Sequence, residues 1–168
     1  MEKFSKPALK RALKKTKYCG TVRGMKESQL ARLDLRAPLF YDKAPGLSPF
    51  GAAFTQNEGG EEFLFCFELD SEQAGRIDPT AENFLGEPVF AGRGPAGGGA
   101  AGEIRLPAGL YLFAQKRGRP GKEECAGMAI EQQKDGLWER IRLDNRLYVR
   151  FLREDGGAVT QLFRPYAP

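Results

Sequence analysis

The stretch EIRLPAGLYLFAQKRG, Glu103–Gly118, places a Pro-Ala-Gly corner in front of a run of apolar residues. Successive side chains of a strand point to opposite faces, so Tyr111 and Phe113 share one face and the small aliphatic residues around them share the other. A strand that is apolar on both faces is covered on both. We therefore expect a buried strand over 108–115, with helices on one face and a surface suited to flat rings and a hydroxyl on the other.

Length and composition indicate one soluble domain. The chain has 168 residues, of which 41% are hydrophobic and 29% are charged, and it has no apolar run of membrane-spanning length. The N-terminus is basic without the apolar core of a secretory signal, so we expect a cytoplasmic protein with no membrane contact. Three widely spaced cysteines, Cys19, Cys66 and Cys125, suggest reduced thiols rather than a disulfide framework.

Histidine is absent from the whole chain. Catalytic pairs of serine or cysteine with histidine, and the histidine-based zinc and iron motifs, are therefore excluded within this chain. Catalysis would have to use carboxylates, tyrosine, lysine or thiol. We expect no metal and no cofactor, and a binding protein rather than an enzyme.

The positive charge is concentrated at the N-terminus. The net charge is +4 and the pI about 9.0, and seven lysines and arginines lie between Lys3 and Lys17. Residues 1–16 are predicted to form a short basic amphipathic helix, which would either pack on the domain or bind an acidic protein partner. The rest of the chain is mixed in sign, and we expect no direct readout of DNA.

The first half of the domain, 17–70, is predicted as strand, helix, strand, strand. The strands are 17–25, 50–56 and 63–70, and the helix starts at Ser28 and ends before Pro38. Residues 71–102 are predicted to be an irregular linker. The glycine-rich part, Ala91–Gly102, lacks the pattern of a phosphate-binding loop and is read as flexible.

The second half, 103–168, repeats this order. The strands are 108–115, 146–152 and 158–163, and the helix is 122–134, stopped by Asp135-Gly136. One alternative stays open, because Asp135-Gly136 is also a common hairpin turn. With the helix, the fold class is α+β: two tandem βαββ units that form a pseudo-twofold antiparallel sheet with helices on one face.

Two short motifs carry a family resemblance. RLPAGLYLFAQ, with its corner and strand tyrosine, and RLYVRFL, with a second tyrosine, resemble the GyrI-like domain, whose fold is shared with the SOUL group, mainly over 103–166. The resemblance implies an aromatic groove between two halves that binds aromatic, often cationic, ligands. It implies ligand-binding roles for Tyr111 and Tyr148. The family's glutamate two residues before the second tyrosine is Arg146 here, which would suit a carboxylate or phosphate instead.

The other candidate ligand-binding residues are aromatic or acidic. Phe113 shares the face of Tyr111, Glu68 could supply an acid from the first half, and Trp138 with Glu139 follows the predicted helix. Each of these also has an ordinary explanation, the aromatic residues as core and the glutamates as solvated surface. Tyr41 and Phe50 would complete the lining if the two halves were pseudo-symmetric.

Three functions are compatible with these residues. The first is a stand-alone small-molecule-binding or sensing protein whose groove takes an aromatic or amphipathic ligand. The second is a protein-interaction module that uses its basic segment, as gyrase-binding relatives do, and the third is a small hydrolase using a carboxylate and a tyrosine.

Overall fold

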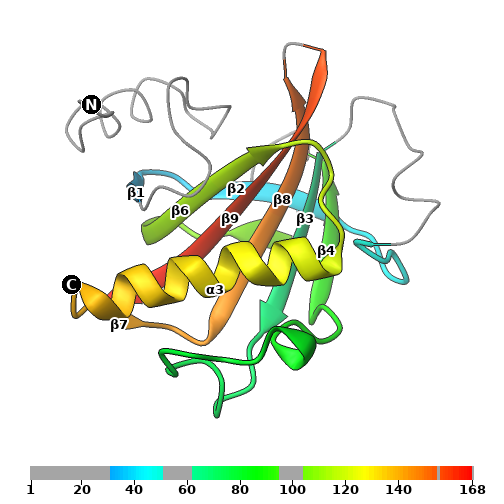
Figure 1. Ribbon diagram of the computed structural model, residues 1–168. Coiled ribbons are helices and arrows are strands. Elements are labelled where there is room, and N and C mark those ends of the chain that lie inside the picture. Colours follow the sequence, from blue (N-terminus) through cyan, green and yellow to red (C-terminus); the bar gives the residue numbers. More distant parts are fainter. Residues whose placement is uncertain (1–30, 51–61, 95–103, 155, 168) are drawn as a thin grey trace.

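The computed structural model describes residues 31–50, 62–94, 104–154 and 156–167 (Figure 1). These residues form one antiparallel sheet of nine strands and a single α-helix, so the protein is mostly β. The predicted fold class, two βαββ units with helices, is wrong. None of the helices among the described residues is long and apolar enough to span a membrane.

The elements follow one another along the chain with few long connections. In order they are β1 (Ala31–Leu35), β2 (Leu39–Lys43), β3 (Glu62–Glu68), the 3-10 helix η1 (Ala81–Asn83), β4 (Phe90–Gly94), β5 (Ile104–Leu106), β6 (Gly109–Arg117), α3 (Lys122–Trp138), β7 (Arg142–Leu143), β8 (Arg146–Glu154) and β9 (Gly157–Ala167).

The order of strands shows that the sheet is curled into a half-barrel. The order is β1-β6-β9-β8-β3-β4-β2-β5, with β7 paired to β9, so strands from the two predicted halves are interleaved. β1 and β2 lie near opposite ends of this order, yet only residues 36–38 separate them, and two residues separate β5 from β6. Such short connections require the two ends of the sheet to approach each other.

A glycine permits the close approach at this closure. A Cβ atom at Gly92 of β4 would lie 2.7 Å from Cβ of Tyr41 on β2 and 3.2 Å from Cγ2 of Ile104 on β5. β2 pairs with β4 on one side and with β5 on the other. Gly92 therefore leaves room where three strands crowd together.

The helix predicted between Ser28 and Pro38 is wrong in the part that the structure describes. Residues 31–35 form β1, in which Ala31, Leu33 and Leu35 are buried and the residues between them are only half-buried. This alternation of buried and half-buried residues has the period of a strand. The spacing of the leucines alone suggested a helix instead. Pro38 lies in the bend between β1 and β2 instead of after a helix. The predicted strands 17–25 and 50–56 fall on or largely on residues outside those described.

Residues 71–102 are not an irregular linker throughout. Phe90–Gly94 forms β4, which lies inside the sheet between β3 and β2. Its sequence, FAGRG, has too few β-branched or aromatic residues to stand out as a strand. It forms a strand because its neighbours in the sheet, β2 and β3, both pair with it.

The strands predicted at 63–70, 108–115, 146–152 and 158–163 are confirmed as β3, β6, β8 and β9. The helix predicted at 122–134 is also confirmed, which rejects the hairpin alternative, but α3 continues to Trp138. Gly136 lies within the helix and packs against the sheet, where a Cβ would lie 2.7 Å from Cδ1 of Leu112. Figure 1 shows α3 crossing one face of the sheet, with the β1–β2 segment on the other side.

Two hydrophobic clusters lie on the two faces. The first packs under α3 and includes Phe65, Phe67 and Phe151 from the sheet with Cys125 and Ala129 from the helix. The second contains side chains from β1, β2, β3, β5, β6, β8 and β9 in one cluster. Strands this far apart in the order share a cluster because the sheet curls around it. We call the side that encloses the second cluster the concave face.

Candidate functional site

The concave face carries a layer of aromatic rings. Tyr111 and Phe113 of β6 meet Phe163 of β9, and Tyr148 of β8 links them to Phe90 of β4. The ring centroids of neighbouring pairs lie 5.2 to 6.4 Å apart, mostly in edge-to-face arrangements. Such pairs stabilise beyond the burial of their area. We call these five residues the aromatic layer.

Tyr111 lies inside this layer and is 2% exposed. Its ring packs edge-to-face against Tyr148 and Phe163. Its hydroxyl donates a hydrogen bond to the carbonyl oxygen of Pro107, which belongs to the Pro-Ala-Gly corner at the start of β6. The corner thus supplies the polar partner that a buried phenol needs. Phe113 is fully buried beside it.

Charged groups lie at one end of the aromatic layer. Glu68 at the end of β3 is directly opposite Arg146 at the start of β8, and the next pair on this face is Cys66 opposite Tyr148. Glu68 and Arg146 are exposed, whereas Cys66 and Tyr148 are buried. Burial raises the pKa of Tyr148, while a hydrogen bond from Arg146 to its hydroxyl acts in the opposite direction. Apolar rings and charged side chains therefore meet at this end.

A polar network lies on the concave face beyond the other end of the layer. Arg150 is fully buried and donates to Glu62 through Nε (3.2 Å) and Nη2 (2.8 Å), to the Tyr41 hydroxyl (3.0 Å) and to Oε1 of Gln161 (3.0 Å). Gln161 in turn donates to Gln115 (3.2 Å). We call these five residues the interior network.

Opposite charges are paired within the interior network. The guanidinium of Arg150 faces the carboxylate of Glu62, which also accepts a hydrogen bond from Tyr41 at 2.9 Å. Burial raises the pKa of Tyr41 far above its usual range, so its hydroxyl stays protonated as a donor to Glu62. A buried guanidinium needs this kind of pairing, because an unpaired charge in the interior is costly.

Four of the candidate residues lie outside the aromatic layer and its charged end. Trp138 ends α3 and is 84% exposed, and the neighbouring Glu139 forms an ion pair of 2.7 Å with Arg32. Phe50 is half-buried and stacks on Phe67 in the cluster under α3, on the opposite face of the sheet. Tyr41 belongs to the interior network. Tyr111, Phe113, Tyr148, Arg146 and Glu68 are brought together.

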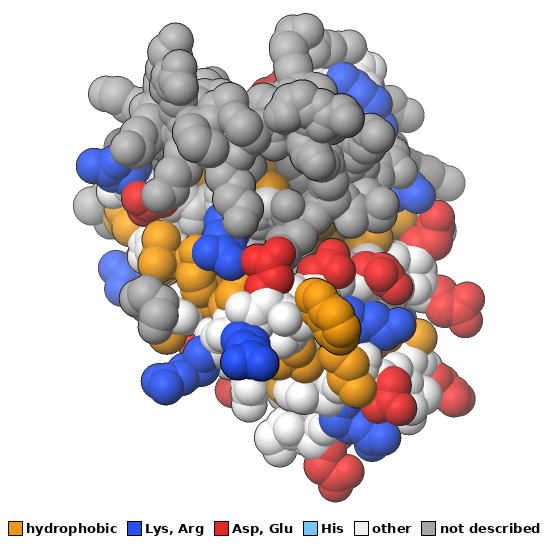
Figure 2. All heavy atoms as spheres, turned by 60° about the vertical axis from the view of Figure 1, so that its left-hand side comes forward, with side chains coloured by type: hydrophobic (Ala, Val, Ile, Leu, Met, Phe, Trp, Pro, Cys, Tyr) orange, Lys and Arg blue, Asp and Glu red, His pale blue; other side chains and the backbone are white. Residues whose placement is uncertain are grey.

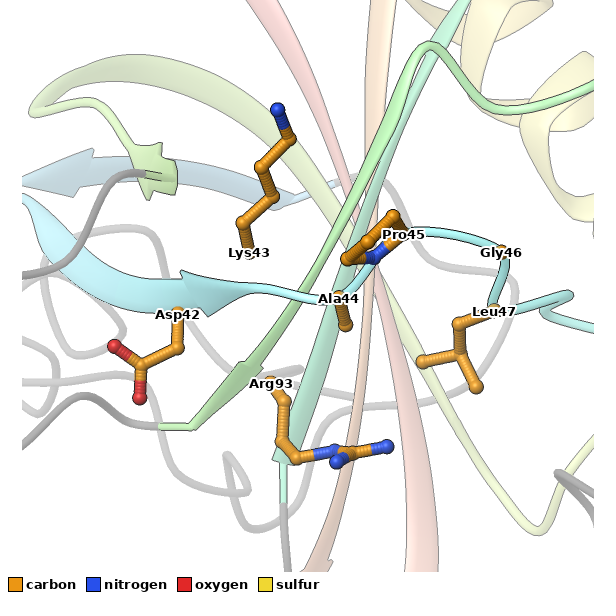
Figure 3. A pocket seen from close by; sticks show the side chains of 7 residues that line it. All are labelled: Asp42, Lys43, Ala44, Pro45, Gly46, Leu47 and Arg93. Carbon is orange, nitrogen blue, oxygen red and sulfur yellow. The ribbon is translucent and has the colours of Figure 1, made fainter.

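An open depression on the surface contains none of the candidate residues. It has a volume of about 470 Å³ and is lined by the β2 end and the following turn, together with Arg93. Figure 3 shows Lys43 on the opposite side of the strand from Asp42 and Arg93, so the two basic side chains do not converge. Figure 2 shows acidic and basic side chains interspersed over the described part of one face.

No metal site is formed within the described ranges. There, no group of three or more cysteine, aspartate and glutamate side chains comes close enough to hold an ion. Burial raises the pKa of the Cys66 thiol to about 11 and that of the Cys125 thiol to about 12. Both thiols therefore stay protonated and unreactive at neutral pH.

Sequence reasoning missed the interior network. Arg150 stands two residues after Tyr148 in the otherwise apolar run LYVRFL, so the strand alternation already places it on the face of Tyr148. An arginine on a buried face signals a buried acidic partner. The sequence alone could not select Glu62 as that partner, because the pairing depends on the register of β3 against β8.

The comparisons leave the family unassigned. No family model matches the chain, and its sequence matches no curated protein. The resemblance to the GyrI-like domain therefore rests on the two motifs alone, and the fold that it implied is wrong.

Proposed function

We propose that this protein binds a small molecule with an aromatic part, at the end of the concave face where Phe90, Tyr148 and Arg146 lie. The observation that carries the proposal is the meeting of the aromatic layer with exposed charged groups at this end. Small-molecule sites are mostly apolar, with a few polar groups that orient the ligand. Phe90 is only half-buried, so one ring of the layer remains accessible.

The curled antiparallel sheet supports this proposal in a general way. Closed and nearly closed sheets enclose side chains or a small ligand on their concave side. Here that side carries tyrosines and phenylalanines together with aliphatic residues. A groove between two pseudo-symmetric halves is no part of this proposal, because the halves do not exist.

The other two functions gain no support from the described residues. The basic segment Lys3–Lys17 lies outside them. A carboxylate that acts as general acid or base is normally buried or paired so that its pKa approaches neutrality. Glu68 and Glu139 are both exposed.

The proposal can be tested by NMR with a library of small aromatic fragments. We expect at least one fragment to shift the backbone amide signals of Phe90, Tyr148 and Cys66, and Tyr148→Ala to abolish these shifts. Trp138→Ala is the matched control and should leave them unchanged, since Trp138 lies on the outside. Shifts confined to the surface of α3, or no binding by any fragment to the folded protein, would refute the proposal.

A further inference from the structure

Arg146 is the charged residue that continues the aromatic layer. Residues two apart in a strand share a face, so Arg146 lies on the same face as Tyr148 and one step closer to the end of the sheet. Tyr148 is opposite Phe163 on one side and Cys66 on the other. A ligand that stacks at this end would meet the guanidinium next.

The guanidinium keeps most of its hydrogen-bonding capacity. Arginine has five N–H donors in a planar fork that fits a carboxylate or phosphate. A donor of the Arg146 guanidinium binds the Tyr148 hydroxyl, and this contact, before any other, raises the pKa of Arg146. Among the described residues, no carboxylate lies within 4 Å of the Arg146 guanidinium.

Two carboxylates are nearby but act differently. Asp144 accepts a hydrogen bond of 3.0 Å from the backbone N–H of Arg146, so it is engaged in the turn before β8. Glu68 is opposite Arg146 but exposed. Burial has the largest effect on the pKa of the Cys66 thiol. Among the charged groups that change this pKa, Arg146 has the largest effect, ahead of Glu68 and Asp144. Arg146 and Glu68 therefore form the charged pair of positions at this end of the layer, and Arg146 is the one that follows Tyr148 on β8.

We propose that the ligand is an aromatic anion, with its ring against Phe90 and its carboxylate or sulfonate paired with Arg146. This inference rests on the proposed function and adds the charge of the ligand. The pairing is a charge-assisted hydrogen bond, which is stronger than a neutral one and is geometrically specific when it is bidentate. The Tyr148 hydroxyl, which accepts from Arg146, helps to hold the guanidinium in place.

The test compares two fluorescent dyes of opposite charge on the full chain, the anion anilinonaphthalene sulfonate and the cation thioflavin T. We expect the anion to bind at least tenfold more tightly, and Arg146→Gln to weaken its binding about tenfold, which corresponds to one charged hydrogen bond. Arg142→Gln removes the same charge from the exposed strand β7 and should change the affinity less than twofold.

Further variants separate the inference from its basis. Arg146→Lys keeps the charge without the planar fork and should recover part of the affinity for the anion. Glu68→Gln should strengthen anion binding slightly. Binding of both dyes with equal affinity, unaffected by Arg146→Gln, would overturn the anion preference and leave the proposed function standing. Failure of both dyes to bind the folded chain would overturn the proposed function and this inference with it.

Discussion

The two faces of the sheet each bury an arginine, and the two arginines are bound by different kinds of acceptor. Arg150 of β8 points to the concave face and pairs with the carboxylate of Glu62. Arg164 of β9 points to the face under α3, where it donates to the Asp144 carbonyl, to Oε1 of Gln133 at 2.9 Å and to the Ala74 carbonyl at 2.7 Å. Both side chains are fully buried.

The difference shows what each arginine does. Arg164 binds neutral acceptors from α3, from the chain before η1 and from the turn before β8. It therefore joins three segments on the face under α3, which we call the covered face. Burial lowers its pKa to about 10, with Asp144 acting in the opposite direction. Arg150 instead binds a carboxylate, that of Glu62 on β3, together with the side chains of Tyr41 on β2 and Gln161 on β9. The covered face is joined by neutral hydrogen bonds and the concave face by a buried ion pair.

Breaking the ion pair should have the largest effect on stability. Arg150→Met leaves Glu62 without its partner in a mostly buried site, and we expect a loss of about 3–5 kcal/mol in the free energy of unfolding. Urea unfolding followed by circular dichroism measures it. Adding Glu62→Gln to this variant removes the uncompensated charge and should recover part of the loss. A double variant that is less stable than Arg150→Met would contradict the ion-pair account.

The concave face should also tolerate added volume poorly. A Cβ at Gly92 would meet Cβ of Tyr41 at 2.7 Å, and that atom is fixed to the backbone of β2. We expect Gly92→Ala to destabilise the protein by about 3 kcal/mol, at the upper end for overpacking. The measurement is again urea unfolding. A loss below that of Gly136→Ala would show that the closure of the sheet is looser than the contacts indicate.

The covered face offers the matched experiment at a glycine with the same close contact. A Cβ at Gly136 would lie 2.7 Å from Cδ1 of Leu112, which is the flexible end of a side chain and can move. Overpacking is partly offset because alanine favours a helix over glycine, so we expect Gly136→Ala to destabilise by only about 1 kcal/mol. Gly127→Ala, in the same helix with open space around it, should stabilise by about 1 kcal/mol.

The sequence predicted the local structure of the second half better than the arrangement of the whole sheet. The strands at 108–115, 146–152 and 158–163 have clear periodicities and turn residues. The same is true of α3, which follows the first of these strands in the chain. β1 and β4 were missed because one can be read with helical spacing and the other has a glycine-rich sequence that only its neighbours make into a strand. The pairing of distant strands depends on register, which local patterns do not encode.

The candidate site shows the same limit. Strand alternation correctly placed Tyr111 with Phe113, and the contact of both with Tyr148 and Phe163 required the sheet order. The assignment of Tyr41 and Phe50 rested on a symmetry that the chain lacks, and they lie on different faces. Trp138 was a candidate because of its residue type, and residue type alone does not determine exposure.

The smallest effect is expected at Trp138. Its side chain is 84% exposed at the end of α3, so Trp138→Ala should change the free energy of unfolding by less than about 0.5 kcal/mol. It should also leave the affinity for aromatic probes unchanged, whereas Tyr148→Ala should abolish their binding. A large loss of stability on replacing Trp138 would mean that its ring packs against another part of the protein. A large loss of binding would mean that the end of α3, and not only the concave face, takes part in binding.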